Sequence, residues 1–221
     1  MEASNIFTKK DQDINNMIKP NKKLVLYHAS NKEIPVQEIN FPGPRGNCDF
    51  GSGFYLTDNK FTAEEWVFEE NSPVINMYTF SAPPSSILHL TGEDWIRVVV
   101  GFRTGKYKVL FSSPVVQGTI ADDRLVTSLI AFLAGDIGDR RLLKSLDYCK
   151  LGDQFLLRND ASCLGDHSSK ILKGLELQQA ADRFRSRRKN MNHGLTLIRR
   201  ESFPEEKYIE HYLEMGDYCE S

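Results

Sequence analysis

The chain has 221 residues, of which 40% are hydrophobic and 26% charged, and its formal net charge is −2. This length suits one domain with an appendage, or at most two small domains, and the composition excludes wholesale disorder. The near-neutral charge gives no whole-surface attraction to nucleic acid or acidic membranes, so binding to a polyanion would need a local patch.

Neither the cysteines nor the N-terminus indicates export. The four cysteines form no CxxC pair and have no histidines at zinc spacing, so we expect no metal site. The first twenty residues contain no apolar segment typical of a secretory signal, and no apolar run is long enough to span a membrane. We therefore expect a cytoplasmic protein.

Residues 1–22 are polar and without helical periodicity, which predicts a flexible lead-in. The apolar run 24–27 predicts a strand, and the proline- and glycine-rich stretch 29–50 predicts a loop. The aromatic segment 53–57 predicts a second strand. Thr62 and Glu65 have the spacing of a capping box before a short helix.

The remaining segments up to residue 164 mix strands and helices. Strands are predicted at 74–80, 87–90, 109–111, 115–116 and 155–157, and helices at 91–102, 119–134 and around 142–146. Because this order lacks regular βαβ alternation, it predicts an α+β domain, residues 23–164, with a mostly antiparallel, split sheet. From residue 165 the spacing of apolar residues predicts a helical C-terminal extension, 165–221.

Three short segments have the residue types of a binding site. His28 ends the first strand in LYHAS, two glycines precede Tyr55 in DFGSGFYLT at 49–57, and Gln154 opens the strand GDQFLL. Glycines let a backbone approach a ligand closely. The chain has no P-loop, no complete dinucleotide-binding fingerprint, no GxSxG elbow and no HExxH motif.

In their order and spacing, these segments resemble the motifs of the ADP-ribosyltransferase superfamily, and the resemblance is closest to a bacterial group of uncharacterised domains assigned to it. The resemblance covers roughly residues 23–164 and includes the stretch GTIADD at 118–123. It implies a fold of split antiparallel β-sheets with flanking helices, to which the C-terminal extension is added. It also implies NAD⁺ as the substrate, without a metal.

The resemblance assigns a role to each motif position. His28 would contact the adenosine ribose of NAD⁺, the backbone at Ala29 would hold the nicotinamide carboxamide, and Tyr55 would stack on the nicotinamide ring. Gln154 would hydrogen-bond a hydroxyl of the nicotinamide ribose, next to a developing positive charge. The remaining expected cofactor-binding positions adjoin these motifs and are Ser30, Gly53 and Phe54.

Two positions depart from the family pattern. Ala29 stands where the family has glycine, and Gln154 stands where most active transferases have glutamate. Glutamine can hydrogen-bond a hydroxyl but supplies no charge and cannot act as a general base. A carboxylate from elsewhere could compensate, and Asp122 and Asp123 are the candidates.

Each of these residues also has a purely structural interpretation. His28 could be a buried histidine satisfied by backbone, Tyr55 a core residue, and Gln154 a residue at the sheet edge. Asp122 and Asp123 could simply begin a helix. Arg45 is a candidate for a pyrophosphate, or a solvated loop residue. The five basic residues in 183–189 are more typical of a solvated helix face than of a nucleic-acid site.

The leading hypothesis is a mono-ADP-ribosyltransferase that modifies a protein, as a bacterial toxin or an effector delivered to a host cytosol. One alternative is a catalytically silent NAD⁺-binding or protein-interaction module that docks a partner through 165–221. A further alternative is an NAD⁺ glycohydrolase, or an enzyme that modifies nucleic acid.

Overall fold

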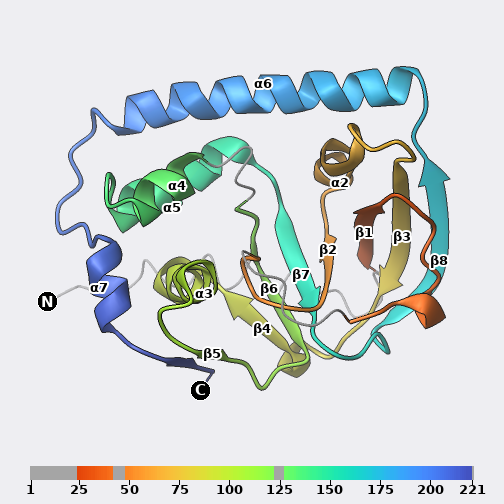
Figure 1. The fold of residues 1–221 in the computed structure, drawn as a ribbon, viewed down its shortest axis with the longest axis horizontal. Helices are drawn as coiled ribbons and strands as arrows, with labels where there is room; N and C mark the ends of the chain where they lie inside the picture. Colours follow the sequence, from red (N-terminus) through yellow and green to blue (C-terminus); the bar gives the residue numbers. More distant parts are fainter. Residues whose placement is uncertain (1–23, 42–47, 122–126, 221) are drawn as a thin grey trace, which may run out of the picture.

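The computed structural model describes residues 24–41, 48–121 and 127–220 (Figure 1). The predicted lead-in 1–22 and the candidate residues Arg45, Asp122 and Asp123 lie outside these ranges. Within them, no helix is long and apolar enough to cross a membrane.

A mixed sheet of seven strands forms the centre of the described part of the chain. Its strands are β1 Leu24–Ser30, β2 Phe54–Thr57, β3 Val74–Phe80, β4 Ile87–Leu90, β6 Val115–Thr119, β7 Asp153–Leu157 and β8 Leu164–Ile171. They lie in the order β4-β6-β7-β2-β1-β3-β8. Only β4 and β6 pair in parallel, and all other neighbours are antiparallel. A small parallel sheet joins β5 Val109–Leu110 to β9 Tyr218–Cys219.

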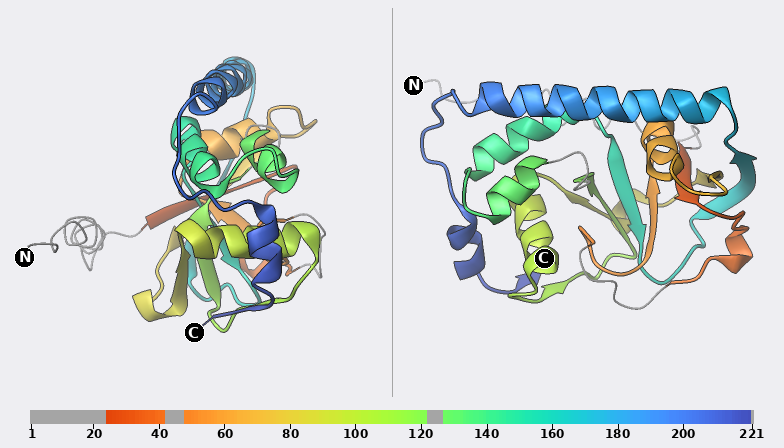
Figure 2. Two further views of the ribbon diagram at one scale, coloured as in Figure 1. Left: turned by 90° about the vertical axis from the view of Figure 1, so that its left-hand side faces the viewer. Right: turned by 45° about the horizontal axis from the view of Figure 1, so that its top comes forward.

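The helices confirm the predicted α+β class. The described residues contain α2 Lys60–Val67, α3 Gly92–Thr104, α4 Thr127–Leu133, α5 Asp139–Cys149, α6 Leu175–Ile198 and α7 Ile209–Glu214, with short 3-10 turns at Val36–Glu38 and Pro84–Ser86. The long helix α6 is the predicted C-terminal helix. It runs along the molecule, and α2, α4 and α5 lie between it and the sheet (Figures 1 and 2).

The predicted capping box at Thr62 and Glu65 is wrong. Helix α2 begins earlier, because the Asn59 side chain accepts hydrogen bonds from the backbone N–H groups of Phe61 (3.1 Å) and Thr62 (3.4 Å). The Thr62 hydroxyl instead donates to the Leu151 carbonyl at 2.7 Å. Glu65 is fully buried and pairs with α6.

Three hydrophobic cores hold these elements together. The largest packs α3, α4, α5 and α6 on one face of the sheet around Trp95, Phe132 and Leu156. The second lies around Leu26, Phe54 and Tyr78, and the third, around Ala63, Val67, Ile75 and Leu172, joins α2 to β3. Strand neighbours alternate between faces, so Phe54 and Leu56 point into the second core while Tyr55 packs against the largest one.

The segment after residue 164 is integrated into the fold. The predicted start of the extension falls inside β8, which pairs with β3 along most of its length. Farther on, the basic run faces inward in part: Arg183 Nη2 lies 2.5 Å from Glu64, and Arg187 Nε lies 2.9 Å from the buried Glu65. Arg185, Arg188 and Lys189 are exposed, as predicted for a solvated helix face.

Candidate functional site

The sheet opens between β1 and β2, and His28 lies at the opening. The two strands pair at a single position, Tyr27 opposite Thr57. One residue beyond it, the Nδ1 atom of His28 lies 2.7 Å from the carbonyl oxygen of Tyr55. Because a carbonyl oxygen only accepts, this nitrogen carries the proton in the hydrogen bond. The imidazole thus joins β1 to β2 where backbone pairing stops.

The His28 ring is held by an aromatic contact as well. It stacks on Phe54, with ring centroids 4.3 Å apart and an angle of 27° between the planes. Phe54 in turn meets Tyr78 edge to face at 6.0 Å. His28 therefore lies on the face of the sheet that bears the second core.

The glycines of the 49–57 segment are required by the fold. Gly51 has φ +83°, and a Cβ atom there would lie 2.5 Å from the Phe102 ring. Gly53 has φ +152°, and its Cβ would lie 2.4 Å from the Leu157 carbonyl oxygen. Both conformations disfavour side chains, and both positions are closed by protein atoms. Close packing of the protein itself thus accounts for these glycines.

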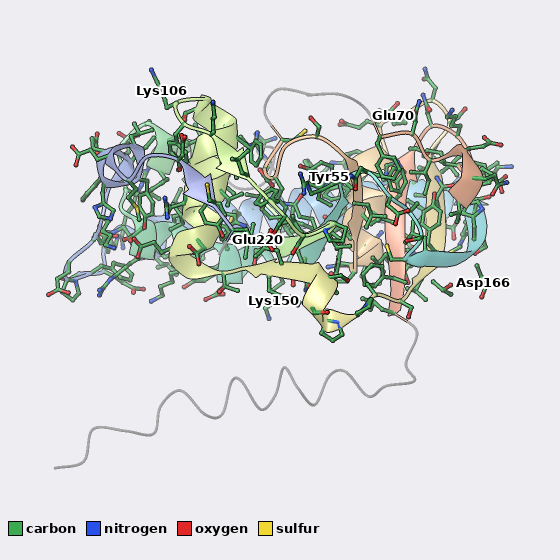
Figure 3. The ribbon with its side chains drawn as sticks, turned by 90° about the horizontal axis from the view of Figure 1, so that it is seen from below. Tyr55, Glu70, Lys106, Lys150, Asp166 and Glu220 are labelled. Carbon is green, nitrogen blue, oxygen red and sulfur yellow. The ribbon has the colours of Figure 1, made fainter. Side chains whose placement is uncertain are left out.

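The Tyr55 side chain is fixed by two hydrogen bonds of its hydroxyl group. Its hydroxyl donates to the Gly51 carbonyl at 2.7 Å and accepts from the Phe50 N–H at 3.1 Å, so the ring closes the turn that precedes its own strand. Burial raises the pKa of the phenol, so it stays protonated. Tyr55 lies near the middle of the molecule, whereas Lys106 and Asp166 mark its two sides (Figure 3).

Gln154 belongs to a buried polar network. Its Nε2 atom donates to Asp49 Oδ2 at 2.7 Å and lies 3.4 Å from the Thr119 carbonyl oxygen. Asp49 Oδ1 also accepts from Arg103, at 3.0 Å from Nε and 2.6 Å from Nη2. Burial raises the pKa of Asp49, and the Arg103 guanidinium opposes that rise.

The segments that contain His28 and Gln154 both contact the 49–57 segment, but their side chains lie on opposite faces of the sheet. Gln154 pairs with Thr57, so Gln154 and Tyr55 share the face of the largest core, opposite His28. Ala29 packs against the third core, and the Ser30 hydroxyl accepts from Asn76 at 3.1 Å.

Two surface cavities in the described residues do not include these side chains. One, of about 470 Å³, is lined by residues that include Tyr27, Lys60 and Lys150, and the other, of about 270 Å³, includes Pro83 and Cys163. Figure 3 shows Lys150 well separated from Tyr55.

Sequence reasoning did not identify Asp49 and Arg103 as members of the site. Asp49 begins the glycine-rich segment, and a carboxylate in an otherwise apolar and glycine-rich stretch could have indicated a buried charge that needs a partner. Arg103 is in the last turn of α3, where a cation is also explained by the helix dipole, so nothing in the sequence pointed to Asp49 as its partner.

Comparison with known proteins gives one match. Residues 24–164 match the model of a family described as a protein of unknown function, DUF3990. No curated protein and no solved structure matches the chain. The matched range contains β1 to β7 and all of the predicted site residues. Since the match covers more than half of the sequence, the chain belongs to the DUF3990 family.

Proposed function

We propose that this protein binds NAD⁺ and transfers its ADP-ribose to a protein. The observation that carries the proposal is the hydrogen bond from His28 to the Tyr55 carbonyl at the opening between β1 and β2. It joins the two segments that resemble the NAD⁺-binding motifs of ADP-ribosyltransferases. The toxin or effector role and the site of action in a host cytosol rest on this resemblance alone.

The resemblance to ADP-ribosyltransferases assigns a chemical role to each residue. Because His28 and Tyr55 lie on opposite faces of the sheet, NAD⁺ would reach both through the opening between β1 and β2. There His28 would contact the adenosine ribose, and the backbone at Ala29 would hold the carboxamide. The Tyr55 ring, already held by two hydrogen bonds, would offer a face to nicotinamide without further ordering. Gln154 would accept a hydrogen bond from the nicotinamide ribose. Breaking the glycosidic bond releases nicotinamide, and a nucleophile on the acceptor protein then bonds to the ribose carbon.

One observation favours a second candidate, an NAD⁺-binding module that does not turn its ligand over. Gln154 is neutral, and the carboxylate that it contacts, Asp49, is paired with Arg103. The carboxylate that contacts Gln154 is therefore neutralised by Arg103 and is less available to stabilise a cationic transition state. In this alternative, the 165–221 segment would dock a partner.

Incubation of the purified protein with a labelled NAD⁺ analogue and cell lysate tests the proposal. A labelled protein band that disappears in His28→Ala and Tyr55→Ala, and persists in the exposed control Tyr208→Ala, would support a transferase. Nicotinamide release without a protein band would indicate a glycohydrolase. Binding of NAD⁺ with neither product would favour the silent module. Label on nucleic acid would indicate a nucleic-acid acceptor and a role for the basic residues in 183–189 in binding it.

A further inference from the structure

We propose that Asp49 is a positioning residue that orients the Gln154 amide so that Oε1 is the atom presented to a ligand hydroxyl. This inference rests on the proposed function, because it names how the same site would recognise the nicotinamide ribose. It concerns a pair of residues 105 positions apart in the chain.

The direction of the amide follows from its partners. A carboxylate with hydrogen-bond donors around it accepts, and a backbone carbonyl oxygen always accepts. Gln154 faces both kinds of acceptor, Asp49 Oδ2 at 2.7 Å and the Thr119 carbonyl at 3.4 Å. Its NH₂ group must therefore point toward them, and its Oε1 atom must point away.

Asp49 is held in the form that imposes this direction. Its two oxygens are approached by the Nε and Nη2 atoms of Arg103, by Gln154 Nε2 and by the backbone N–H of Ala121 at 3.3 Å. All of these groups are donors, so an ionised carboxylate satisfies every one of them. Arg103 supplies the compensating positive charge within the buried network.

The remaining amide atom is the one that points to a ligand. Gln154 is only 4% exposed, yet within the described ranges its Oε1 makes no hydrogen bond. A buried acceptor oxygen without a hydrogen bond is suited to a hydroxyl donor from a ligand.

The same network explains why glutamine stands where the resembling transferases have glutamate. A glutamate in this position would set a second carboxylate against Asp49, and two carboxylates at such a separation do not both ionise. With glutamine, the chain keeps an outward-facing acceptor oxygen, and the negative charge lies on Asp49, which the amide NH₂ group contacts. The Gln154 amide oxygen thus accepts the hydrogen bond that a carboxylate oxygen of glutamate would accept.

The test measures NAD⁺ affinity by calorimetry and thermal unfolding for four variants of the full chain. Gln154→Met removes the amide and leaves Asp49 with Arg103. Gln154→Glu creates the carboxylate pair, and Asp49→Asn combined with Gln154→Glu exchanges amide and carboxylate. The control is Gln117→Met, because Gln117 Nε2 donates to Asp153 Oδ2 at 2.8 Å in a similar amide–carboxylate pair outside the network.

We expect Gln154→Met to weaken NAD⁺ binding about three- to tenfold, the effect of one hydrogen bond, and Gln117→Met to leave it unchanged. Gln154→Glu should bind NAD⁺ more weakly than the wild type, because the new carboxyl group and Asp49 share a proton and the fixed orientation of the amide is lost. The exchange variant should recover most of that loss, which a merely structural role for Asp49 would not produce.

Each alternative outcome has a distinct meaning. If the wild-type protein binds no NAD⁺, the proposed function fails and this inference with it. If the wild type binds but Gln154→Met binds equally well, or the folded exchange variant recovers nothing, the inference alone is overturned. If the exchange variant does not fold, Gln154→Glu decides, because an affinity equal to that of the wild type would show that Asp49 does not control the atom that residue 154 presents.

Discussion

Arg187→Ala should destabilise the protein far more than the loss of one helix-surface arginine would. Arg187 Nε lies 2.9 Å from Oε2 of Glu65, whose side chain is 1% exposed, and Arg187 also donates to the Lys150 carbonyl at 2.8 Å. Removing one partner of a buried ion pair costs about 3–5 kcal/mol, because the remaining charge stays buried. Arg183 remains 3.7 Å from Glu65 and offsets part of this, so we expect a loss of about 3 kcal/mol.

Urea unfolding at neutral pH, followed by circular dichroism, measures this loss. The control is Arg188→Ala, one residue along the same helix on its exposed side, which should change the free energy of unfolding by less than about 0.5 kcal/mol. In thermal unfolding, the Arg187 variant should melt roughly 6–12 °C lower.

Replacing both partners provides a further check. Arg187→Met with Glu65→Leu removes both charges and should be more stable than Arg187→Ala alone. Equal losses in Arg187→Ala and Arg188→Ala, or a double variant less stable than Arg187→Ala, would refute the buried-pair reasoning.

Three other expectations concern pH, backbone strain and the tyrosine. Burial raises the pKa of Glu65 above its ordinary value of 4.5, so the stability that its protonated form contributes at low pH should be lost as pH rises through the folded-state pKa. Urea titrations between about pH 4 and pH 7 should show this decline, and Glu65→Gln should lack it; an unchanged slope would contradict the assignment. Gly53→Ala should cost clearly more than about 1–2 kcal/mol, whereas Gly216→Ala, also at positive φ but in open space, should stay within that range; equal melting temperatures would show that the contact with Leu157 relaxes. Tyr55→Phe should lose about 1–2 kcal/mol of stability but keep NAD⁺ affinity, while Tyr55→Ala loses both; unchanged affinity in Tyr55→Ala would exclude ring stacking.

The fold was predictable where residue types are constrained by the core. The apolar runs at 24–27 and 74–80 became β1 and β3 because both strands contribute to cores. Strand β8 was missed, since the sequence LGDHSSKI lies at the edge of the sheet and most of its residues are exposed or half-buried. An edge strand of this kind needs no apolar alternation, and its pairing is decided by β3.

The start of α2 was misplaced for a different reason. Asn59 and Thr62 are both residue types that cap helices, and local sequence does not choose between them. The choice was made by Leu151, two residues after the end of α5, whose carbonyl oxygen accepts a hydrogen bond from the Thr62 hydroxyl.

In the candidate site, too, local sequence predicted some residues, and the others depend on contacts between distant parts of the chain. Local sequence identified His28, Tyr55 and Gln154 from their positions at strand ends and beside glycines. The partners of these residues come from distant parts of the chain: Asp49 and Gln154 are 105 residues apart, and Arg103 and Asp49 are 54 apart. A single sequence contains no information on such pairings, so the network around Asp49 required the structure.

The position of α6 limits how the chain can be divided for study. A polypeptide that stopped at Leu164, where the family match ends, would lose Met191, Leu195 and Ile209 from the largest core and would uncover one edge of β3. It would also leave Glu64 and Glu65 without their arginines. Such a fragment should aggregate or stay unfolded when expressed alone, and a negative assay of NAD⁺ binding with it would say nothing about the whole protein.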